Sequence, residues 1–248
     1  MQNSSKYYDE TSFTRVFSWH WYKDQMSGWT TASYILLTIG ILFQLYIGVI
    51  NGLVQGHGID ALAITSTVAG IIGFSCTVSI TNGRPINGIL GFVSAVMLIY
   101  VALVTKNFSD IIMQGAYIIL LDIPILLQKK WSNHEPRKMT GTDIWQTALI
   151  FLVFLAATYI LDTVILDSPQ ALLDAISATI GLTGAILTVR RFRSSYYFWT
   201  AQGIMSVALW IQTAMNGHPV WVLMITYMLY LANDVVAFTD SKWFRKNR

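Results

Sequence analysis

The chain has 248 residues, of which 54% are hydrophobic and only 12% are charged, with a formal net charge of +3. A soluble domain carries about 25% charged residues, so this composition excludes a soluble protein and requires lipid around much of the surface. The small net charge gives no indication of a nucleic-acid partner, and the one cysteine, Cys76, excludes a disulfide framework or a cysteine metal site.

Eight apolar stretches follow one another along the chain, each near the roughly 20 residues that cross a bilayer. The first covers 32–54 and comes after a polar and aromatic segment, 1–30. The others cover 61–80, 86–105, 109–128, 144–166, 172–190, 196–215 and 219–238. Turn residues such as Asn82-Gly83-Arg84-Pro85 and Asp167-Ser168-Pro169 separate them. The sequence therefore predicts an all-α integral membrane protein with eight transmembrane helices.

Basic residues are distributed unequally between the two sides that these helices define. Fifteen of the 16 Lys and Arg residues fall in the N-terminus, the even-numbered connections, the central loop and the tail, and Lys106 alone lies on the other side. Cytoplasmic loops carry such an excess of positive charge. We therefore expect a multi-pass protein of the inner, or cytoplasmic, membrane with both termini in the cytoplasm.

The first half of the chain recurs in the second half. Ser66, Gly70, Gly73, Thr77 and Val78 are repeated 111 positions later as Ser177, Gly181, Gly184, Thr188 and Val189. Ala116-Tyr117 corresponds to Thr226-Tyr227, and Lys130-Trp131 corresponds to Lys242-Trp243. Internally duplicated membrane proteins are commonly transporters with a site between the repeats.

The repeat organises the helices into a 3+1+3 arrangement preceded by one extra helix. We expect an accessory helix over 31–54, a first three-helix repeat over 61–131, a linker helix over 143–166 and a second three-helix repeat over 172–240. One linker helix returns the chain to its starting side. The two repeats are therefore parallel in orientation rather than inverted.

Polar side chains form stripes inside the apolar segments. They include Asn87 in the third helix, Gln114 and Tyr117 in the fourth, Trp199 and Gln202 in the seventh, and Tyr227 and Asn233 in the last. Polar groups that face lipid are costly, so these stripes face one another or water. Interhelical hydrogen bonding is the structural alternative to a solute path.

The residue types indicate the solute. Aromatic faces stack on flat rings and attract ring cations, and amides offer both donors and acceptors for ribose hydroxyls or a carboxamide. A nucleoside or a vitamin with a flat heterocycle fits this set. No phosphate loop, H-E-x-x-H or G-x-S-x-G motif is present, so the sequence predicts no enzyme, catalytic residue, cofactor or metal site.

The chain resembles the Pnu family of bacterial vitamin transporters over about residues 61–245. The resemblance rests on the 3+1+3 arrangement, the Q-x-x-Y of Gln114 and Tyr117, the run Tyr196-Tyr197-Phe198-Trp199 after a basic segment, and Asn233. It implies a fold like that of the sugar-carrying SWEET proteins, a homotrimer and facilitated diffusion. Phosphorylation of the solute inside the cell then traps it.

The resemblance also implies the site residues. A family W-x-x-W pair contacts substrate; here Trp199 matches its second member and Tyr196 replaces the first. Trp199 and Tyr196 are expected to stack on the ring, and Gln114, Tyr117 and Asn233 to contact its polar groups. The residue stripes add Tyr227, Gln202 and Asn87, although Gln202 does not match a nearby family Asn in register.

Nicotinamide riboside is the expected solute. Thiamine, riboflavin and a nucleoside or deoxynucleoside remain alternatives, because relatives carry each of them. A membrane-embedded structural or sensory subunit that moves nothing is the alternative from another class. The expected partners are the vitamin or nucleoside, the lipid bilayer and two further copies of the chain.

Overall fold

The computed structural model describes residues 16–50, 61–105, 108–128, 131, 135–167, 171–215 and 221–244. Within these ranges the chain forms helices joined by turns, together with one isolated bridge between Arg137 and Phe192. The all-helical class expected from the sequence is therefore confirmed for the described part of the chain.

The helices fall close to the predicted stretches. The N-terminal ones are α1 (Trp19–Gln25) and α2 (Thr31–Leu45), and α2 continues into a π-helical segment, η2 (Tyr46–Ile50). Then come α4 (Ala61–Thr81), α5 (Asn87–Thr105) and a composite helix of α6 (Phe108–Tyr117), η3 (Ile118–Asp122) and α7 (Ile123–Leu127). The second half forms α8 (Gly141–Ile160) with η5 (Leu161–Ile165), α9 (Ala171–Val189), α10 (Ser195–Met215) and α11 (Trp221–Asp240). The expected end of the first helix, 51–54, lies outside the described residues.

Five helical stretches among the described residues are long and apolar enough to cross a membrane: Thr31–Ile50, Ala61–Thr81, Asn87–Val104, Gly141–Ile165 and Ala171–Val189. A further apolar helix, Ile111–Leu127, is shorter. The helices α10 and α11 have 21 and 20 residues but contain more Tyr, Trp, Gln and Asn. Large apolar side chains on α8 and η5 point outward, with Leu152 61% and Val164 75% exposed, as on a surface that faces lipid.

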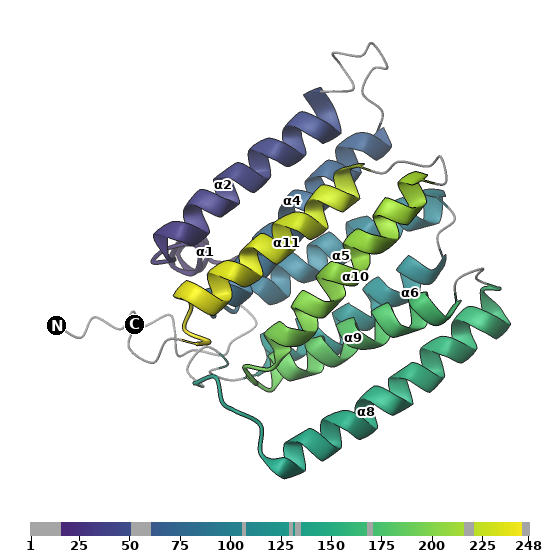
Figure 1. Cartoon of the computed structure of the whole chain (residues 1–248). Coiled ribbons are helices and arrows are strands. Elements are labelled where there is room, and N and C mark those ends of the chain that lie inside the picture. The colour runs from purple at the N-terminus through teal and green to yellow at the C-terminus, as the bar shows by residue number, and fades with distance from the viewer. Residues whose placement is uncertain are drawn as a thin grey trace.

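The long helices run side by side, with α2 at one edge of the bundle and α8 at the opposite edge (Figure 1). The helix α2 packs against α4 and α11, whereas α8 packs against α9. Between these edges, α4 contacts α11, and α9 contacts α6 and η3. The first helix of each sequence repeat therefore packs against the last helix of the other repeat, so that the two halves are crossed.

The helices α4 and α9 end with the same backbone geometry. Gly83 has φ 65° and Arg191 has φ 58°, both in the left-handed region. The amides of Arg84 and Phe192 close the last turns by donating to the carbonyls of Ser79 and Leu187, at 2.9 Å each. Glycine adopts this Schellman geometry freely, but a side chain there costs about 1 kcal/mol. Contacts of the Arg191 side chain must offset that cost.

Those contacts come from two tryptophans. Trp131 Nε1 donates to the Val189 carbonyl at 3.2 Å, and Trp243 Nε1 donates to the Ile80 carbonyl at 2.8 Å. The Arg191 guanidinium lies 4.4 Å from the Trp131 ring centroid and 4.6 Å from that of Trp243. Buried cation–π contacts of this kind are stabilising. We call Trp131, Trp243 and Arg191 the tryptophan clamp.

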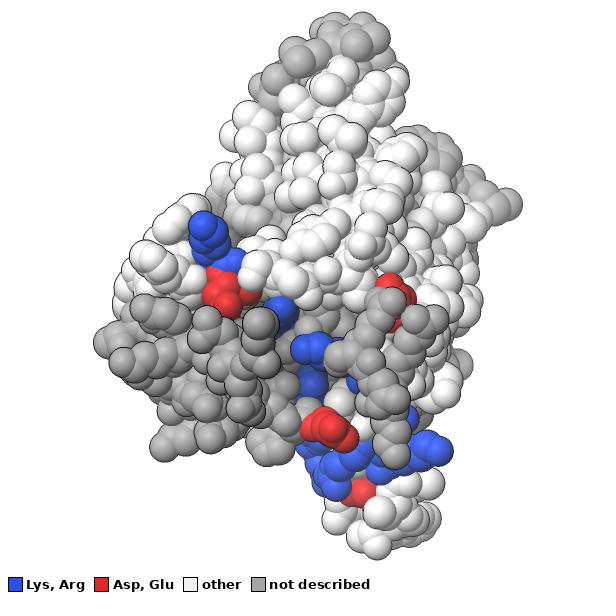
Figure 2. Space-filling view, turned by 90° about the vertical axis from the view of Figure 1, so that its left-hand side faces the viewer, with Lys and Arg blue, Asp and Glu red and all other residues white. Residues whose placement is uncertain are grey.

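Figure 2 shows Lys and Arg residues gathered on one face of the molecule. We call the part of the bundle with Arg84, Arg191 and Lys242, whose charges act on one another, the basic end, and the tryptophan clamp lies there through Arg191. Arg84 donates from Nη2 to the Ser27 carbonyl at 2.5 Å and so fixes the segment after α1 to the α4–α5 turn. Burial lowers the pKa of Arg84 from its usual value and lowers that of Arg191 to about 10. Arg191 is therefore still charged at neutral pH.

Candidate functional site

The middle of α9 carries a polar and aromatic group that joins the two repeats. Gln202 Nε2 on α10 donates to Tyr117 Oη on α6 at 2.8 Å. Both side chains lie directly over Gly181, where a methyl group would clash with the Tyr117 hydroxyl and the Gln202 amide. The repeated glycine is thus required for a close approach. Its partners come from opposite halves of the chain.

A tryptophan completes this group. Trp199 on α10 lies with its ring centroid 6.2 Å from that of Tyr117, at an interplanar angle of 46°. Its Nε1 donates to Thr188 Oγ1 at 2.9 Å, which fixes the orientation of the indole. We call Tyr117, Trp199, Gln202, Gly181 and Thr188 the central site. Three of the predicted residues, Tyr117, Trp199 and Gln202, are therefore brought together.

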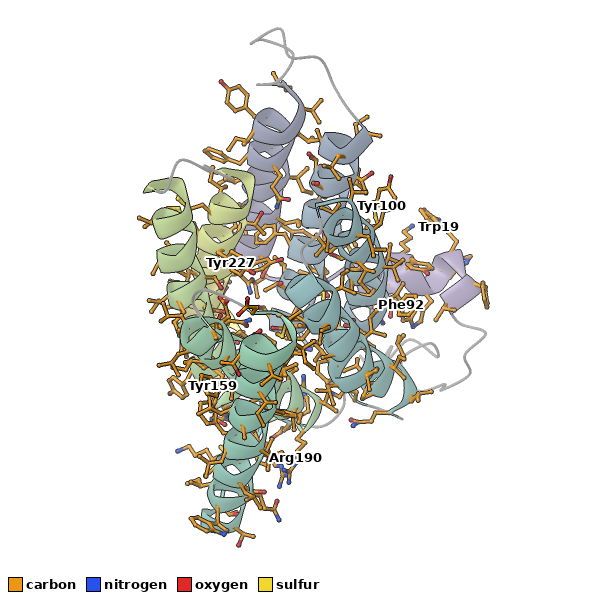
Figure 3. The ribbon with its side chains drawn as sticks, turned by 90° about the vertical axis from the view of Figure 1, so that its right-hand side faces the viewer. Trp19, Phe92, Tyr100, Tyr159, Arg190 and Tyr227 are labelled. Carbon is orange, nitrogen blue, oxygen red and sulfur yellow. The ribbon has the colours of Figure 1, made fainter. Side chains whose placement is uncertain are left out.

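Two more predicted residues lie on helices that line the same region. Gln114 is half-buried one turn before Tyr117 on α6. Tyr227, the repeat counterpart of Tyr117, is half-buried on α11, and its ring lies 5.7 Å from that of Tyr230 in an edge-on arrangement. In Figure 3 Tyr227 lies toward the middle of the bundle, whereas Trp19 lies at its edge.

Tyr196 and Asn233 belong to a different network, closer to the basic end. Thr81 Oγ1 lies 3.0 Å from Tyr196 Oη, and Asn233 Nδ2 donates to the same Oγ1 at 2.8 Å. Tyr196 is 1% exposed, and its ring packs edge-on against Trp243 at 5.3 Å. Both predicted residues are thus hydrogen-bonded inside the protein, where they link α4 to α10 and α11. We call Thr81, Tyr196 and Asn233 the inner network.

Asn87 also has its contacts elsewhere. It is fully buried at the first residue of α5, and its Nδ2 donates to the Arg84 carbonyl at 2.5 Å. The Cys76 thiol donates to its backbone carbonyl at 3.2 Å. These contacts hold the α4–α5 turn and do not involve the central site.

Two buried carboxyls occupy matching places in the repeats. Asp122 and Asp234 are separated by 112 positions, and they are 2% and 4% exposed. Thr200 Oγ1 donates to Asp234 Oδ2 at 2.9 Å, whereas Asp122 lies directly against Gly91. Among the described residues no three His, Cys, Asp or Glu side chains gather as a metal site requires.

Pattern analysis of the sequence missed several residues of these groups. Thr188 was recognised only as a repeated residue, although it orients Trp199. Thr81 links Tyr196 to Asn233, and nothing in its spacing indicates this. Gln44, one residue before the end of the apolar helix α2, is 1% exposed. A lone amide in an apolar stretch is a signal that the search for polar stripes did not use.

Comparisons with known proteins agree with this architecture. The profile of a family described as nicotinamide mononucleotide transporter matches residues 63–245. The nicotinamide riboside transporter PnuC of Haemophilus influenzae is 22% identical over 222 residues, which cover 86% of this chain and 90% of that protein. A crystal structure of the vitamin B3 transporter PnuC has 19% sequence identity and a TM-score of 0.72, and the match covers 91% of this chain and 96% of that one.

A membrane-spanning transporter, not an enzyme, is the class that these helices and comparisons define. Within that class, the chain belongs to the nicotinamide mononucleotide transporter family, whose profile covers most of its length. The resemblance to the Pnu transporters seen in the sequence is thereby confirmed.

Proposed function

We propose that this chain imports a nucleoside-like vitamin, nicotinamide riboside, across the inner membrane by facilitated diffusion. The observation that carries the proposal is the Gln202–Tyr117 hydrogen bond over Gly181, with Trp199 beside it. This group puts two aromatic rings and one amide between the two halves of a chain that belongs to a transporter family.

The chemistry of the central site fits this solute class. The electron-rich faces of Trp199 and Tyr117 attract a flat cationic ring, and the pyridinium of nicotinamide riboside is such a ring. Gln202 and Gln114 offer donors and acceptors for its carboxamide. Tyr227 is proposed as the aromatic wall on the side of the first repeat. Each contact is non-covalent and reversible, as a carrier requires.

The inner network has a different proposed role. Tyr196 and Asn233 are buried and bonded to each other through Thr81, between the central site and the tryptophan clamp. We assign them to closing the path toward the basic end, because solute can pass there only after α4 separates from α10 and α11. Asn87 is assigned to the α4–α5 turn.

The overall mechanism completes the proposal. Eight transmembrane helices form two parallel three-helix repeats, joined by α8 and preceded by the accessory helix α2, in a SWEET-like 3+1+3 order. Rocking of the repeats exposes the central site to each side in turn. Both termini are cytoplasmic, and three copies of the chain assemble. Transport needs no coupling ion. Phosphorylation inside the cell retains the vitamin, and the product enters NAD biosynthesis.

A binding panel on the purified protein tests the substrate. We expect nicotinamide riboside to bind more tightly than thiamine, riboflavin or deoxynucleosides in calorimetric titration, and Trp199→Ala to weaken its binding by about tenfold or more. Trp145→Ala is the matched control, because Trp145 is 76% exposed on α8. Tight thiamine binding without a response to nicotinamide riboside would make thiamine the substrate in place of nicotinamide riboside. Binding of none of these solutes would favour a non-transporting subunit.

A further inference from the structure

The accessory helix α2 carries a buried amide whose polar atoms have no partner within the described structure. Gln44 is 1% exposed, and neither its Oε1 nor its Nε2 forms a hydrogen bond with a described residue. A buried amide that stays unbonded is destabilising. Its neighbours on α2 are apolar, so the glutamine does not serve helix formation.

The amide points at the repeat counterpart of the central-site glycine. A methyl group on Gly70 would lie 2.5 Å from Gln44 Oε1 and 3.9 Å from Thr226 Oγ1. Gly70 corresponds to Gly181, which Gln202 approaches in the same way from the other half. Gly70 and Gly181 therefore each face one amide, and the two amides face corresponding places in the two halves.

The two halves obtain these amides from different helices. The repeat offset of 111 pairs Gln202 with Gly91, so the first repeat has no amide at this position. Gly91 instead lies directly against Asp122. The accessory helix packs against α4 and α11, where it supplies Gln44 to the first repeat. A helix outside the duplication thus restores the symmetry of the polar groups.

We infer that Gln44 is a solute-binding residue, which hydrogen-bonds the hydroxylated arm of the solute while the central site holds its ring. This inference rests on the proposed function. An amide both donates and accepts, as does a sugar hydroxyl, and the two buried atoms of Gln44 match a vicinal pair of hydroxyls. The accessory helix is then part of the site and sets specificity for a ribose.

The test compares nicotinamide riboside with its 2′,3′-dideoxy analogue by calorimetric titration of the full-length protein. Wild type is expected to bind the riboside about tenfold more tightly, a ratio typical of a lost pair of hydrogen bonds. Gln44→Leu is expected to bind both compounds alike, at the wild-type affinity for the analogue. Gly70→Ala, which pushes the amide aside without removing it, should reduce the same preference.

Gln25→Leu is the matched control, since Gln25 is also 1% exposed with a buried unbonded Oε1 but lies on α1. It should keep the riboside preference. If Gln44→Leu keeps that preference too, the amide bonds only water and the inference is wrong while the transporter remains. If wild type binds neither compound, the proposed function fails and the inference falls with it.

Discussion

Trp131 and Trp243, which the sequence repeat pairs with each other, each hydrogen-bond the first helix of the opposite half. Trp131 donates to Val189 on α9, and Trp243 donates to Ile80 on α4. The two ring centroids lie 6.3 Å apart, so the two connections between the halves lie close together. This crossing ties both halves together at the basic end, on the side where the proposed mechanism requires them to separate.

Trp243→Phe should therefore weaken the closed state while preserving most of the aromatic packing. The change removes one neutral hydrogen bond, so we expect the free energy of unfolding to fall by about 1 kcal/mol. That corresponds to a decrease in Tm of about 2–4 °C, measured by thermal unfolding in detergent. Trp145→Phe, on the exposed face of α8, should leave Tm unchanged. An equal Tm for Trp243→Phe and wild type would contradict the assigned bond.

Gly181→Ala should disable the central site without unfolding the protein. The new methyl group would meet the Tyr117 hydroxyl and the Gln202 amide, and both side chains would have to move. We expect the affinity for nicotinamide riboside to fall by about tenfold or more, because misplaced groups lose their bonds. Calorimetric titration measures this change.

Gly115→Ala is the control for that substitution, since nothing lies within 4 Å of a methyl group there. It should leave binding unchanged and stabilise α6 slightly, because alanine favours helix by about 1 kcal/mol over glycine. Equal binding by both alanine variants would remove Gly181 from the site.

Tyr196→Phe should separate the inner network from solute binding. The hydroxyl bonds Thr81 and the ring is buried against Trp243, so its loss should lower Tm by a few degrees. Binding of nicotinamide riboside should stay within about twofold of wild type, in contrast to Trp199→Ala. A large loss of affinity in Tyr196→Phe would show that the Tyr196 hydroxyl contacts the solute, and would contradict its assignment to the inner network.

The contribution of Arg191 to stability should not vary near neutral pH. Its pKa in the folded protein, about 10, is below its value in the unfolded chain, so both states hold the proton at pH 6–8. Only above about pH 10 does the unfolded state bind more protons, and stability linked to Arg191 then rises with pH. The difference in Tm between wild type and Arg191→Gln should be the same at pH 6 and pH 8; a difference that changes across this range contradicts a permanently charged group.

Hydropathy and repeats were sufficient to predict where the helices lie, because both signals are local or periodic. The π-helical segments η2, η3 and η5 were not predictable in this way, since one extra residue per turn leaves hydropathy unchanged. The recurrence of Gly70 and Gly181 did indicate close packing at matching positions. Which side chains approach those glycines depends on the crossing of the two halves.

Tyr196 and Trp199 illustrate that limit. They lie three residues apart on α10, at the positions of the family's W-x-x-W pair, and the resemblance therefore implied that both contact the solute. One turn of axial rise moves Tyr196 toward Thr81 and the tryptophan clamp, whereas Trp199 lies against Tyr117 and Thr188. Long-range partners decide these contacts, and no single-helix pattern contains them.

Uptake of labelled nicotinamide riboside into proteoliposomes, without any ion gradient, tests facilitated diffusion most directly. The account predicts that wild type equalises the inner and outer concentrations, that Trp199→Ala slows the initial rate by about tenfold or more, and that Trp145→Ala does not. The account would be contradicted if wild type showed no protein-dependent uptake. It would also be contradicted if the solute accumulated above the outer concentration with no kinase inside.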